Sequence, residues 1–202
     1  MEAATGVRMD YDHNLLAAGL DRCLSRASES LPHRPNIHTK IQPIVANGRP
    51  ATRLSIPQEL SVGINLPFSG QANGYLIMHL PWSGAQRLWG EVEASTPLTP
   101  NDLTFDHLQF FTSWVQQWGV EFLDVVLRPN NLASEIEPAR LAVEMPIAIM
   151  QTVAIEAMRR KMVVVPFSLS ISVADTSMGG QALLAMLPSR LRQIKARGEI
   201  AA

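Results

Sequence analysis

The stretch VGINLPFSGQANGYLIMHLPWSGAQRLWGEV, residues 62–92, decides the fold of this chain. Two apolar runs, 61–68 and 74–80, flank the turn-forming residues SGQAN, and this pattern is typical of a β-hairpin. Pro81 ends the second run, and apolar residues then recur at helical spacing over 82–92. The sequence therefore predicts a strand, a turn, a second strand and a helix, in that order.

A similar order of elements returns about 100 residues later. The run MVVVPFSLSISV (162–173) is followed by a glycine turn region at 179–180, by QALLAML (181–187), by Pro188 and by a basic helical segment, 189–197. Pro-Phe-Ser and Leu-Pro recur at matching places, which favours a duplicated unit over a chance likeness of two hairpins. We expect an α/β (α+β) fold with pseudo-two-fold symmetry, in which both hairpins join one mixed sheet.

Two longer helical patterns stand before these hairpins. Residues 14–31 place leucines at helical spacing, and residues 102–127 form the longest such pattern in the chain. A proline stops each pattern, Pro32 the first and Pro129 the second, because a helix interior does not tolerate its ring. We expect these long helices to cover one face of the sheet.

The sequence does not decide the secondary structure of two segments. Residues 33–59 fit edge strands or an irregular excursion, because prolines and an Asn-Gly pair punctuate them. Residues 147–160 fit a strand or a short helix, because the run is apolar with weak periodicity. The length of 202 residues fits one domain, 1–202, with halves at about 14–92 and about 102–197.

The composition argues against several classes of function. The formal net charge is −1 with both signs interspersed, so no broad positive field would concentrate a nucleic acid. The single cysteine, Cys23, cannot form an internal disulfide, and neither the polar start of the chain nor any apolar run indicates export or direct membrane insertion. We therefore expect a cytoplasmic protein. Only 17% of the residues are charged, which leaves uncharged surface for a protein partner.

The chain contains no common catalytic or metal-binding motif. Its five histidines show neither a pair at i,i+4 nor an HExxH arrangement, so we expect no metal site. We expect His79 to be a partly buried strand residue with one hydrogen bond. No serine stands in a G-x-S-x-G elbow, and the glycines match neither a phosphate loop nor a dinucleotide fingerprint. No cofactor is expected.

The two repeated stretches resemble the bacterial superfamily that contains the chemotaxis phosphatases CheC and CheX and the middle domain of the flagellar switch protein FliM. The first stretch, 62–92 followed by LTPND (98–102), is similar to that superfamily's order of strand, glycine turn, strand, helix and Thr-led long helix. The second, SEIEPARLAVEMP (134–146) and then VVVPFSLSISVADTSMGGQALLAMLPSRLRQI (163–194), looks like the closing part of the FliM middle domain. Together they cover over half of the chain. The resemblance implies a CheC/FliM-middle-domain-like fold.

In the phosphatase branch, the resemblance implies a Glu and an Asn three residues apart on an exposed helix face. They enter the active site of a phosphorylated CheY-type receiver, where the Asn amide positions the attacking water. The corresponding helix, 102–127, carries no such pair. Ser113 and Gln116 have the right spacing, and Thr112 and Val115 take these positions in a shifted register. A glutamine can orient a water, but a serine cannot make the charged contact of a glutamate.

In the FliM branch, the domain packs against copies of itself in a rotor ring and contacts FliG through a glycine-rich loop after the helix of the first half. At the matching place this chain has one glycine followed by a glutamate. We also expect partner contacts along the polar stripe of the helix over 102–127, with a tryptophan beside it as the anchor, because Trp offers large contact area at little entropy cost. The residues expected to contact a partner are Gly90, Glu91, Gln109, Ser113, Trp114 and Gln116.

The resemblance therefore implies a non-enzymatic protein-interaction domain of bacterial chemotaxis, of the flagellar motor switch or of a related type III secretion complex. Such a domain would self-associate and bind a receiver domain or a ring protein. The alternative is an atypical CheC/CheX-like phosphatase of a phosphorylated CheY-type response regulator, with Ser113 and Gln116 at its catalytic site.

Overall fold

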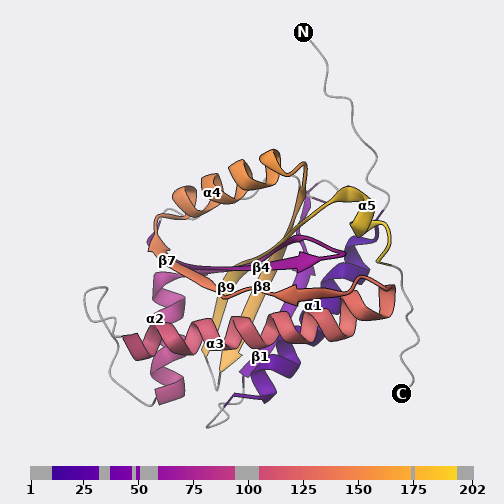
Figure 1. Ribbon diagram of the computed structural model, residues 1–202. Coiled ribbons are helices and arrows are strands. Elements are labelled where there is room, and N and C mark those ends of the chain that lie inside the picture. Colours follow the sequence, from indigo (N-terminus) through magenta and orange to yellow (C-terminus); the bar gives the residue numbers. More distant parts are fainter. Residues whose placement is uncertain are drawn as a thin grey trace.

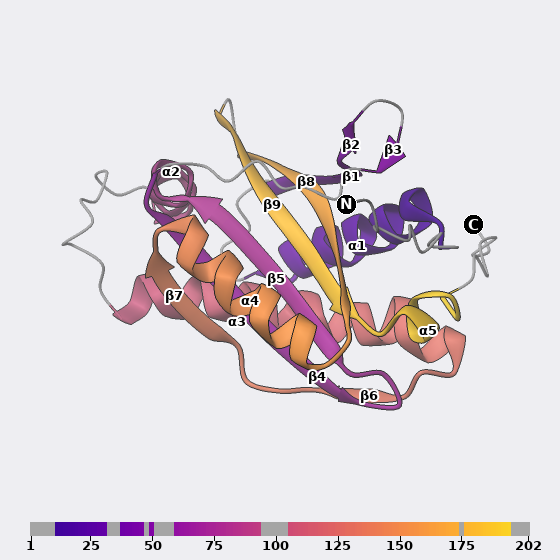
Figure 2. The same ribbon diagram turned by 90° about the horizontal axis from the view of Figure 1, so that it is seen from above.

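The two predicted hairpins lie side by side in the centre of one sheet (Figure 2). The first consists of β4 (Ser61–Gly70) and β5 (Gly74–Pro81), and the second of β8 (Val163–Val173) and β9 (Thr176–Met186). Strands β5 and β9 pair with each other, so the two halves of the chain meet at the middle of the sheet. This confirms the α+β fold in which both hairpins share one sheet.

The structure is a computed structural model, and it describes residues 11–31, 37–46, 49–50, 59–93, 105–173 and 176–194. Its sheet has the strand order β1-β8-β9-β5-β4-β6, and β7 also pairs with β4. The order is symmetric about the β5–β9 pair: β1 (Ile37–Pro43) of the first half flanks β8, whereas β6 (Ser134–Ile136) and β7 (Arg140–Glu144) of the second half flank β4. The exchange of edge strands fits the expected pseudo-two-fold duplication.

Two details of the predicted sheet are wrong. Every described pairing is antiparallel, so the sheet is not mixed. Connections between strands that are not neighbours, such as α4 between β7 and β8, do not place paired strands in parallel. The second hairpin does not turn at Gly179-Gly180, which lie inside β9, but between Val173 and Thr176. Gly180 instead allows a close strand approach, since a Cβ there would lie 2.7 Å from the carbonyl oxygen of His79.

The two long helices cover one face of the sheet, as predicted. Helices α1 (His13–Glu29) and α3 (Phe105–Phe122) run below the sheet in Figure 1 and pack against each other. Helix α3 continues into a π-helical turn, Leu123–Leu127, and a 3-10 turn, Arg128–Asn130. The main hydrophobic core fills the space between these helices and the sheet. Its largest fully buried side chains include Trp114, Trp118, Phe68, Phe111, Phe122, Phe167, Leu20 and Leu24.

The opposite face of the sheet carries one helix. The open segment 147–160 is helical within α4 (Pro146–Arg159), which lies above the sheet in Figure 1. Its buried residue Val153 joins a small second cluster with side chains of β5 and β9, among them Ile77 and Leu183. The face covered by α1 and α3 and the face covered by α4 are called the α1/α3 face and the α4 face below.

The remaining elements frame the sheet. The open segment 33–59 contains the edge strand β1 and a small ladder of β2 (Val45–Ala46) and β3 (Arg49–Pro50), and residues 51–58 lie outside the described residues. Helix α2 (Trp82–Glu93) follows β5 directly, as predicted. The expected basic helix 189–197 is shorter, because α5 spans Pro188–Leu191, and residues beyond 194 lie outside the description.

Candidate functional site

Helix α3 carries the predicted polar stripe on the side turned away from the core. Gln109 and Ser113 are exposed there. Gln116, one turn further on, is half-buried, and both ends of its side-chain amide are used inside the molecule. Its Oε1 accepts a hydrogen bond from the backbone N–H of Ala139 (3.1 Å), and its Nε2 donates to the carbonyl of Glu137 (3.4 Å). Gln116 therefore holds the chain that leads into β7.

The alternative register for a phosphatase pair also fails to present two polar side chains. Val115 is fully buried, and Thr112 is half-buried with an interaction of its own. Of the two registers, only Ser113 combines an exposed position with a polar group. The helix thus does not bring together a charged contact and a free amide at the spacing that the phosphatase branch would need.

The prediction that Trp114 anchors a partner is wrong, because the side chain is 0% exposed. Its indole Nε1–H donates to the hydroxyl of Ser28 on α1 (3.1 Å), and that hydroxyl donates to the carbonyl of Leu24 (2.8 Å). Trp118 makes a similar tie to α1, donating to the carbonyl of Leu20 (3.1 Å). A buried indole needs such an acceptor, and the two tryptophans lock α3 onto α1 rather than waiting for a partner.

Gly90 and Glu91, expected in a partner-binding loop, continue helix α2, which ends at Glu93. The loop that follows, 94–104, lies outside the described residues. Consequently the structure does not bring Gly90 and Glu91 together with Gln109 and Ser113 into one described site.

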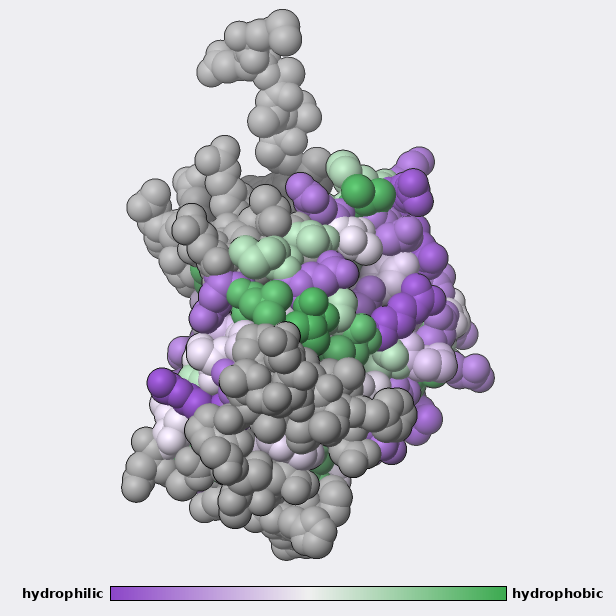
Figure 3. Space-filling view, turned by 90° about the vertical axis from the view of Figure 1, so that its left-hand side faces the viewer, coloured by the Kyte–Doolittle hydropathy of each residue, from purple (hydrophilic) through white to green (hydrophobic). Residues whose placement is uncertain are grey.

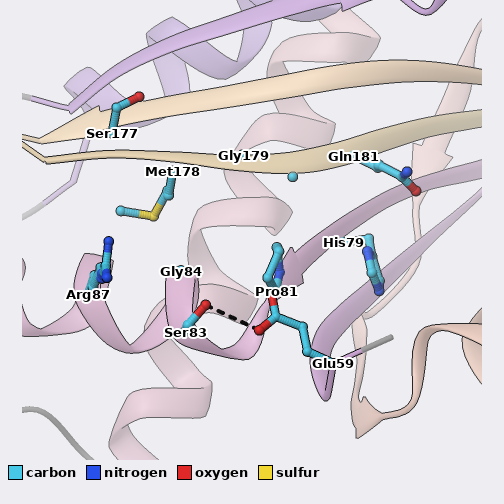
Figure 4. Close-up of a pocket in the computed structure, with 11 residues that line it drawn as sticks. Glu59, His79, Pro81, Ser83, Gly84, Arg87, Ser177, Met178, Gly179 and Gln181 are labelled. Atoms are coloured by element: carbon cyan, nitrogen blue, oxygen red, sulfur yellow. Dashed lines mark hydrogen bonds between the residues drawn. The ribbon is translucent and has the colours of Figure 1, made fainter. Parts of the chain in front are cut away.

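A polar cleft lies where β5 ends and α2 begins. Its volume is about 480 Å³, and β9 forms one wall while the first turns of α2 form the other. Figure 4 shows Arg87 and Ser177 at one end of the cleft, and His79 and Gln181 at the other. Glu59 lies between them, and its carboxylate accepts a hydrogen bond from the Ser83 hydroxyl at 3.4 Å. The remaining lining residues are Pro81, Gly84, Met178, Gly179 and Gly180.

His79 is the unusual group in this cleft. Its side chain is 1% exposed, and neither ring nitrogen has a hydrogen-bond partner among the described residues. The expected single hydrogen bond is therefore not found. Burial lowers the pKa of the imidazole from its ordinary value of 6.5, because the charged form loses its hydration. The lowered pKa favours the neutral ring at neutral pH, with one donor and one acceptor that no described residue satisfies.

No group of three or more His, Cys, Asp or Glu side chains that could hold a metal ion occurs in the part of the chain that the structure describes. Among the described helices, none combines the length and apolar character needed to cross a membrane. Cys23 is buried in α1, and burial raises the pKa of its thiol to about 12, so the thiol is protonated and unreactive at neutral pH.

Sequence reasoning missed the cleft because its walls come from distant parts of the chain. Glu59 precedes β4, Arg87 belongs to α2, and Gly179 belongs to β9. One available signal is the Gly179-Gly180 pair, which we assigned to a turn. Gly179 has open space around it, since a Cβ there would meet nothing within 4 Å, and this space is part of the cleft.

Comparison with known proteins gives a consistent result for the fold. No family model matches the chain, and no curated protein matches it in sequence. Among solved structures, the chain is similar to Thermotoga maritima FliY, with a TM-score of 0.57 and 8% identity over 90% of each chain. It is also similar to a chain of the FliG-FliM complex from H. pylori (TM-score 0.51, 16% identity, 89% of this chain and 92% of that one).

A third similar structure is a chain of the CheX-CheY-BeF3-Mg complex from Borrelia burgdorferi, with a TM-score of 0.51 and 12% identity over 89% of this chain and 99% of that one. The similarity extends over nearly the full length of all three neighbours. Together they show that the protein has the CheC/CheX/FliM fold that the repeated hairpins predicted.

Proposed function

We propose that the protein is a non-enzymatic interaction domain, similar to the FliM middle domain, of bacterial chemotaxis, the flagellar motor switch or a related type III secretion complex. In this role it self-associates and binds a receiver domain or a ring protein in the cytoplasm. The fold supports this proposal, because neighbours with the same fold are solved as complexes of FliM with FliG and of CheX with CheY. Fold alone does not separate binding from catalysis.

The hydrogen bonding of the Gln116 side chain is the observation that favours a binding role over catalysis. To position a water in a receiver's active site, an amide must project from the helix with its polar atoms free. The amide of Gln116 instead bonds to Glu137 and Ala139, and freeing it would break two hydrogen bonds, each worth about 1 kcal/mol. Ser113, its neighbour on the stripe, lacks the charge of the expected glutamate. These observations favour a domain that holds its partner without hydrolysing a phosphate.

The outer surface of α3 remains our candidate for the partner contact. Gln109 and Ser113 are both exposed on it, and Val120, one of the exposed large hydrophobic residues among those described, is 39% exposed further along the same helix. A polar stripe beside an exposed apolar residue suits a transient protein contact, where polar groups dominate the rim.

The test uses the purified full chain with the CheY-type receiver and the FliG-type switch protein of the same organism. The receiver is phosphorylated with a small phosphodonor, and phosphate loss is followed with and without the chain. We expect the intrinsic rate of phosphate loss and a measurable complex with one of the two proteins. Loss that accelerates with the chain, and returns to the intrinsic rate in Gln116→Ala, would establish the phosphatase instead.

Two variants separate a surface effect from a folding effect. Ser113→Arg places a long charged side chain on the exposed stripe and should weaken the complex while leaving thermal stability unchanged. Arg22→Glu, an exposed change on α1, is the matched control and should leave binding intact. If neither protein binds the wild-type chain, the proposed role is wrong.

A further inference from the structure

The polar cleft at the start of α2 lies on the α4 face of the sheet. Side chains alternate along β5, and Met78 and Leu80 belong to the main core, so His79 projects to the opposite face. Its pairing partner on β9 is Gln181, and both residues line the cleft. The volume of about 480 Å³ lies within the range of roughly 300–1,000 Å³ that is typical of small-molecule sites. The cleft is therefore large enough for a small ligand.

A buried polar group without a partner faces this cleft. Both ring nitrogens of His79 lack a hydrogen-bond partner among the described residues, although the side chain is only 1% exposed. Burying a polar group without a partner is unfavourable, so such a group marks a place where a water or a ligand supplies the missing hydrogen bonds. A neutral imidazole matches a ligand group that both donates and accepts, such as a hydroxyl or an amide.

Two opposite charges line the same cleft about one helical turn apart. Ser83 and Arg87 stand four residues apart on α2 and thus on one face of the helix. The Ser83 hydroxyl donates to the carboxylate of Glu59 (3.4 Å), which places this carboxylate at the first turn of α2. No ion pair joins Arg87 to Glu59 or to another described residue. Both charged side chains are exposed, so a ligand can reach them.

Hydrogen bonds of the neighbouring backbone hold Glu59 in this place. The Ser61 hydroxyl donates to the carbonyl of Glu59 (3.1 Å), and the backbone N–H of Trp82 donates to the carbonyl of Leu60 (2.8 Å). The residues before β4 are thereby tied to the start of α2. The position of the carboxylate at the cleft therefore follows from the way in which β4 and α2 begin.

The order of these groups along the cleft matches the three substituents of an α-amino acid. Figure 4 shows Glu59 between Arg87 at one end and His79 at the other. A guanidinium binds a carboxylate through two parallel hydrogen bonds, and a carboxylate accepts charge-assisted hydrogen bonds from an ammonium group. An α-amino acid carries its carboxylate, its ammonium group and its side chain on one carbon, so it presents one substituent to each residue. Gly179 leaves room for it, because a Cβ there would meet nothing within 4 Å.

The surroundings suit a polar ligand. Figure 3 views the molecule from the side on which α2 lies in Figure 1, and it shows an apolar patch bordered by polar side chains. Among the residues that line the cleft, Met178 and Pro81 have apolar side chains, and the others are polar residues or glycines. A lipid or a wholly apolar ligand would bury these polar groups without giving them partners, which is unfavourable.

We propose that the cleft binds a free α-amino acid with a short polar side chain, such as asparagine or serine. In this site, the guanidinium of Arg87 holds the ligand's carboxylate, the carboxylate of Glu59 holds its ammonium group, and the imidazole of His79 bonds to its side chain. This inference goes beyond the proposed interaction role and does not depend on it, because no residue of α3 lines the cleft.

The first test is isothermal titration calorimetry of the full chain with L-asparagine, for which we expect a dissociation constant below about 1 mM. N-acetyl-L-asparagine lacks the ammonium group, and the α-amide of L-asparagine lacks the carboxylate. Each should bind at least about tenfold more weakly, because it leaves one charge of the cleft without its partner. The two derivatives also imitate the ends of a peptide. L-Alanine, which offers no hydrogen bond to His79, should bind about tenfold more weakly as well.

Variants test whether the ligand occupies the cleft. Arg87→Gln and Glu59→Gln should each weaken asparagine binding at least about tenfold. Gly179→Leu fills the cleft and should abolish binding, whereas Gly179→Ala leaves most of the space and should stay within about threefold of wild type. His79→Phe keeps a buried ring and should remove the preference for asparagine over alanine. The matched control is Arg22→Gln, the same change at an exposed site of α1.

Thermal unfolding of each variant checks that the fold is retained. Three results would overturn the proposal: no binding of asparagine or serine at millimolar concentration, acetate or inorganic phosphate binding as tightly as asparagine, or asparagine binding that survives both Arg87→Gln and Gly179→Leu. The assays with the receiver and the FliG-type protein do not require the amino acid, so this inference and the proposed function can fail separately.

Discussion

The two faces of the sheet differ in how completely their polar groups are used. On the α1/α3 face, the indole groups of Trp114 and Trp118 both hydrogen-bond to α1, whereas the buried indole N–H of Trp82, at the start of α2, has no described partner. On the α4 face, His79 is buried without a described partner. Arg140 and Glu144 are exposed there without an ion pair to any described residue, and Met158 of α4 is 71% exposed.

The polar side chains of the α1/α3 face therefore serve mainly to hold the fold, whereas those of the α4 face are available to bind another molecule. Most polar groups buried in a core have partners, because an unpaired group costs about 1–3 kcal/mol. The polar cleft and the exposed side chains of Arg140 and Glu144 therefore give the α4 face and its margin binding capacity in addition to that of the outer surface of α3. On α3, this capacity is confined to the exposed outer stripe with Gln109 and Ser113, because Trp114 and Trp118 on its inner side hold the helix onto α1.

The largest expected effect tests whether Trp114 belongs to the core. Trp114→Ala should lower the free energy of unfolding by about 3–5 kcal/mol, because it removes a fully buried aromatic side chain. Trp114→Phe keeps most of the volume but removes the donor to Ser28, and should cost about 1 kcal/mol. Urea unfolding measures both. A Trp114→Ala variant of wild-type stability with weakened partner binding would show that the side chain is a surface anchor.

The next effect concerns the closeness of α3 to the sheet. A Cβ at Gly119 would overlap Leu66 of β4, which is fully buried, and would lie 3.0 Å from Ile136 Cδ1. Gly119→Ala should therefore cost about 1–3 kcal/mol through overpacking. The matched variant on the other face is Gly179→Ala, whose Cβ meets nothing within 4 Å and which should change stability by less than about 0.5 kcal/mol. Equal effects at both sites would remove the contrast between the faces.

The third effect tests the structural role of Gln116. Gln116→Ala removes both hydrogen bonds to the chain before β7 and should destabilise the protein by about 1–2 kcal/mol. Ser113→Ala, three residues away and exposed, should lie within about 0.5 kcal/mol of wild type. Thermal unfolding of the pair measures the difference, and a Gln116→Ala variant as stable as Ser113→Ala would leave the amide available for chemistry.

The smallest expected effect is a pH dependence from His79. Because burial lowers its pKa below 6.5, the unfolded chain binds the proton more readily than the folded one. Stability from this group is fully present above pH 6.5 and falls on acidification until the folded pKa is passed, with a slope of at most about 1.4 kcal/mol per pH unit. Urea unfolding between pH 5 and 8 should show a flatter profile for His79→Gln than for wild type.

The control for this profile is His13→Gln, since burial also lowers the pKa of His13. His13 lies at the start of α1, away from the cleft, and its removal should leave the contribution of His79 in place. Identical profiles for wild type and His79→Gln would mean that a water or ligand satisfies the ring equally in both protonation states.

Much of the fold could be predicted because local patterns determine it. The two hairpins follow from apolar runs bounded by prolines and glycine turns, and the long helices follow from their apolar spacing. The turn of the second hairpin was misplaced because a glycine pair signals either a turn or a close backbone approach, and Gly180 serves the approach to His79. Which of these applies depends on a neighbouring strand about 100 residues away, which local patterns do not reveal.

The site was harder to predict than the fold. A polar stripe on α3 could be identified from spacing, but its hydrogen-bond partners at Glu137 and Ala139 lie beyond the helix and are set by the tertiary structure. Trp114 lies beside the apolar stripe by sequence, yet α1 packs on that side and buries it. The pairing of β7 with β4, with no described strand on the other side of β7, likewise depends on strand order.

Phosphate loss from a phosphorylated CheY-type receiver, followed as the concentration of the chain is raised, tests the account most directly, because two hydrogen bonds hold the amide of Gln116 inside the molecule. We predict that the receiver loses phosphate at its intrinsic rate at every concentration of the chain. A rate that rises with the concentration of wild-type chain, but not with that of Gln116→Ala, would contradict the account, because the amide would then be free to position a water.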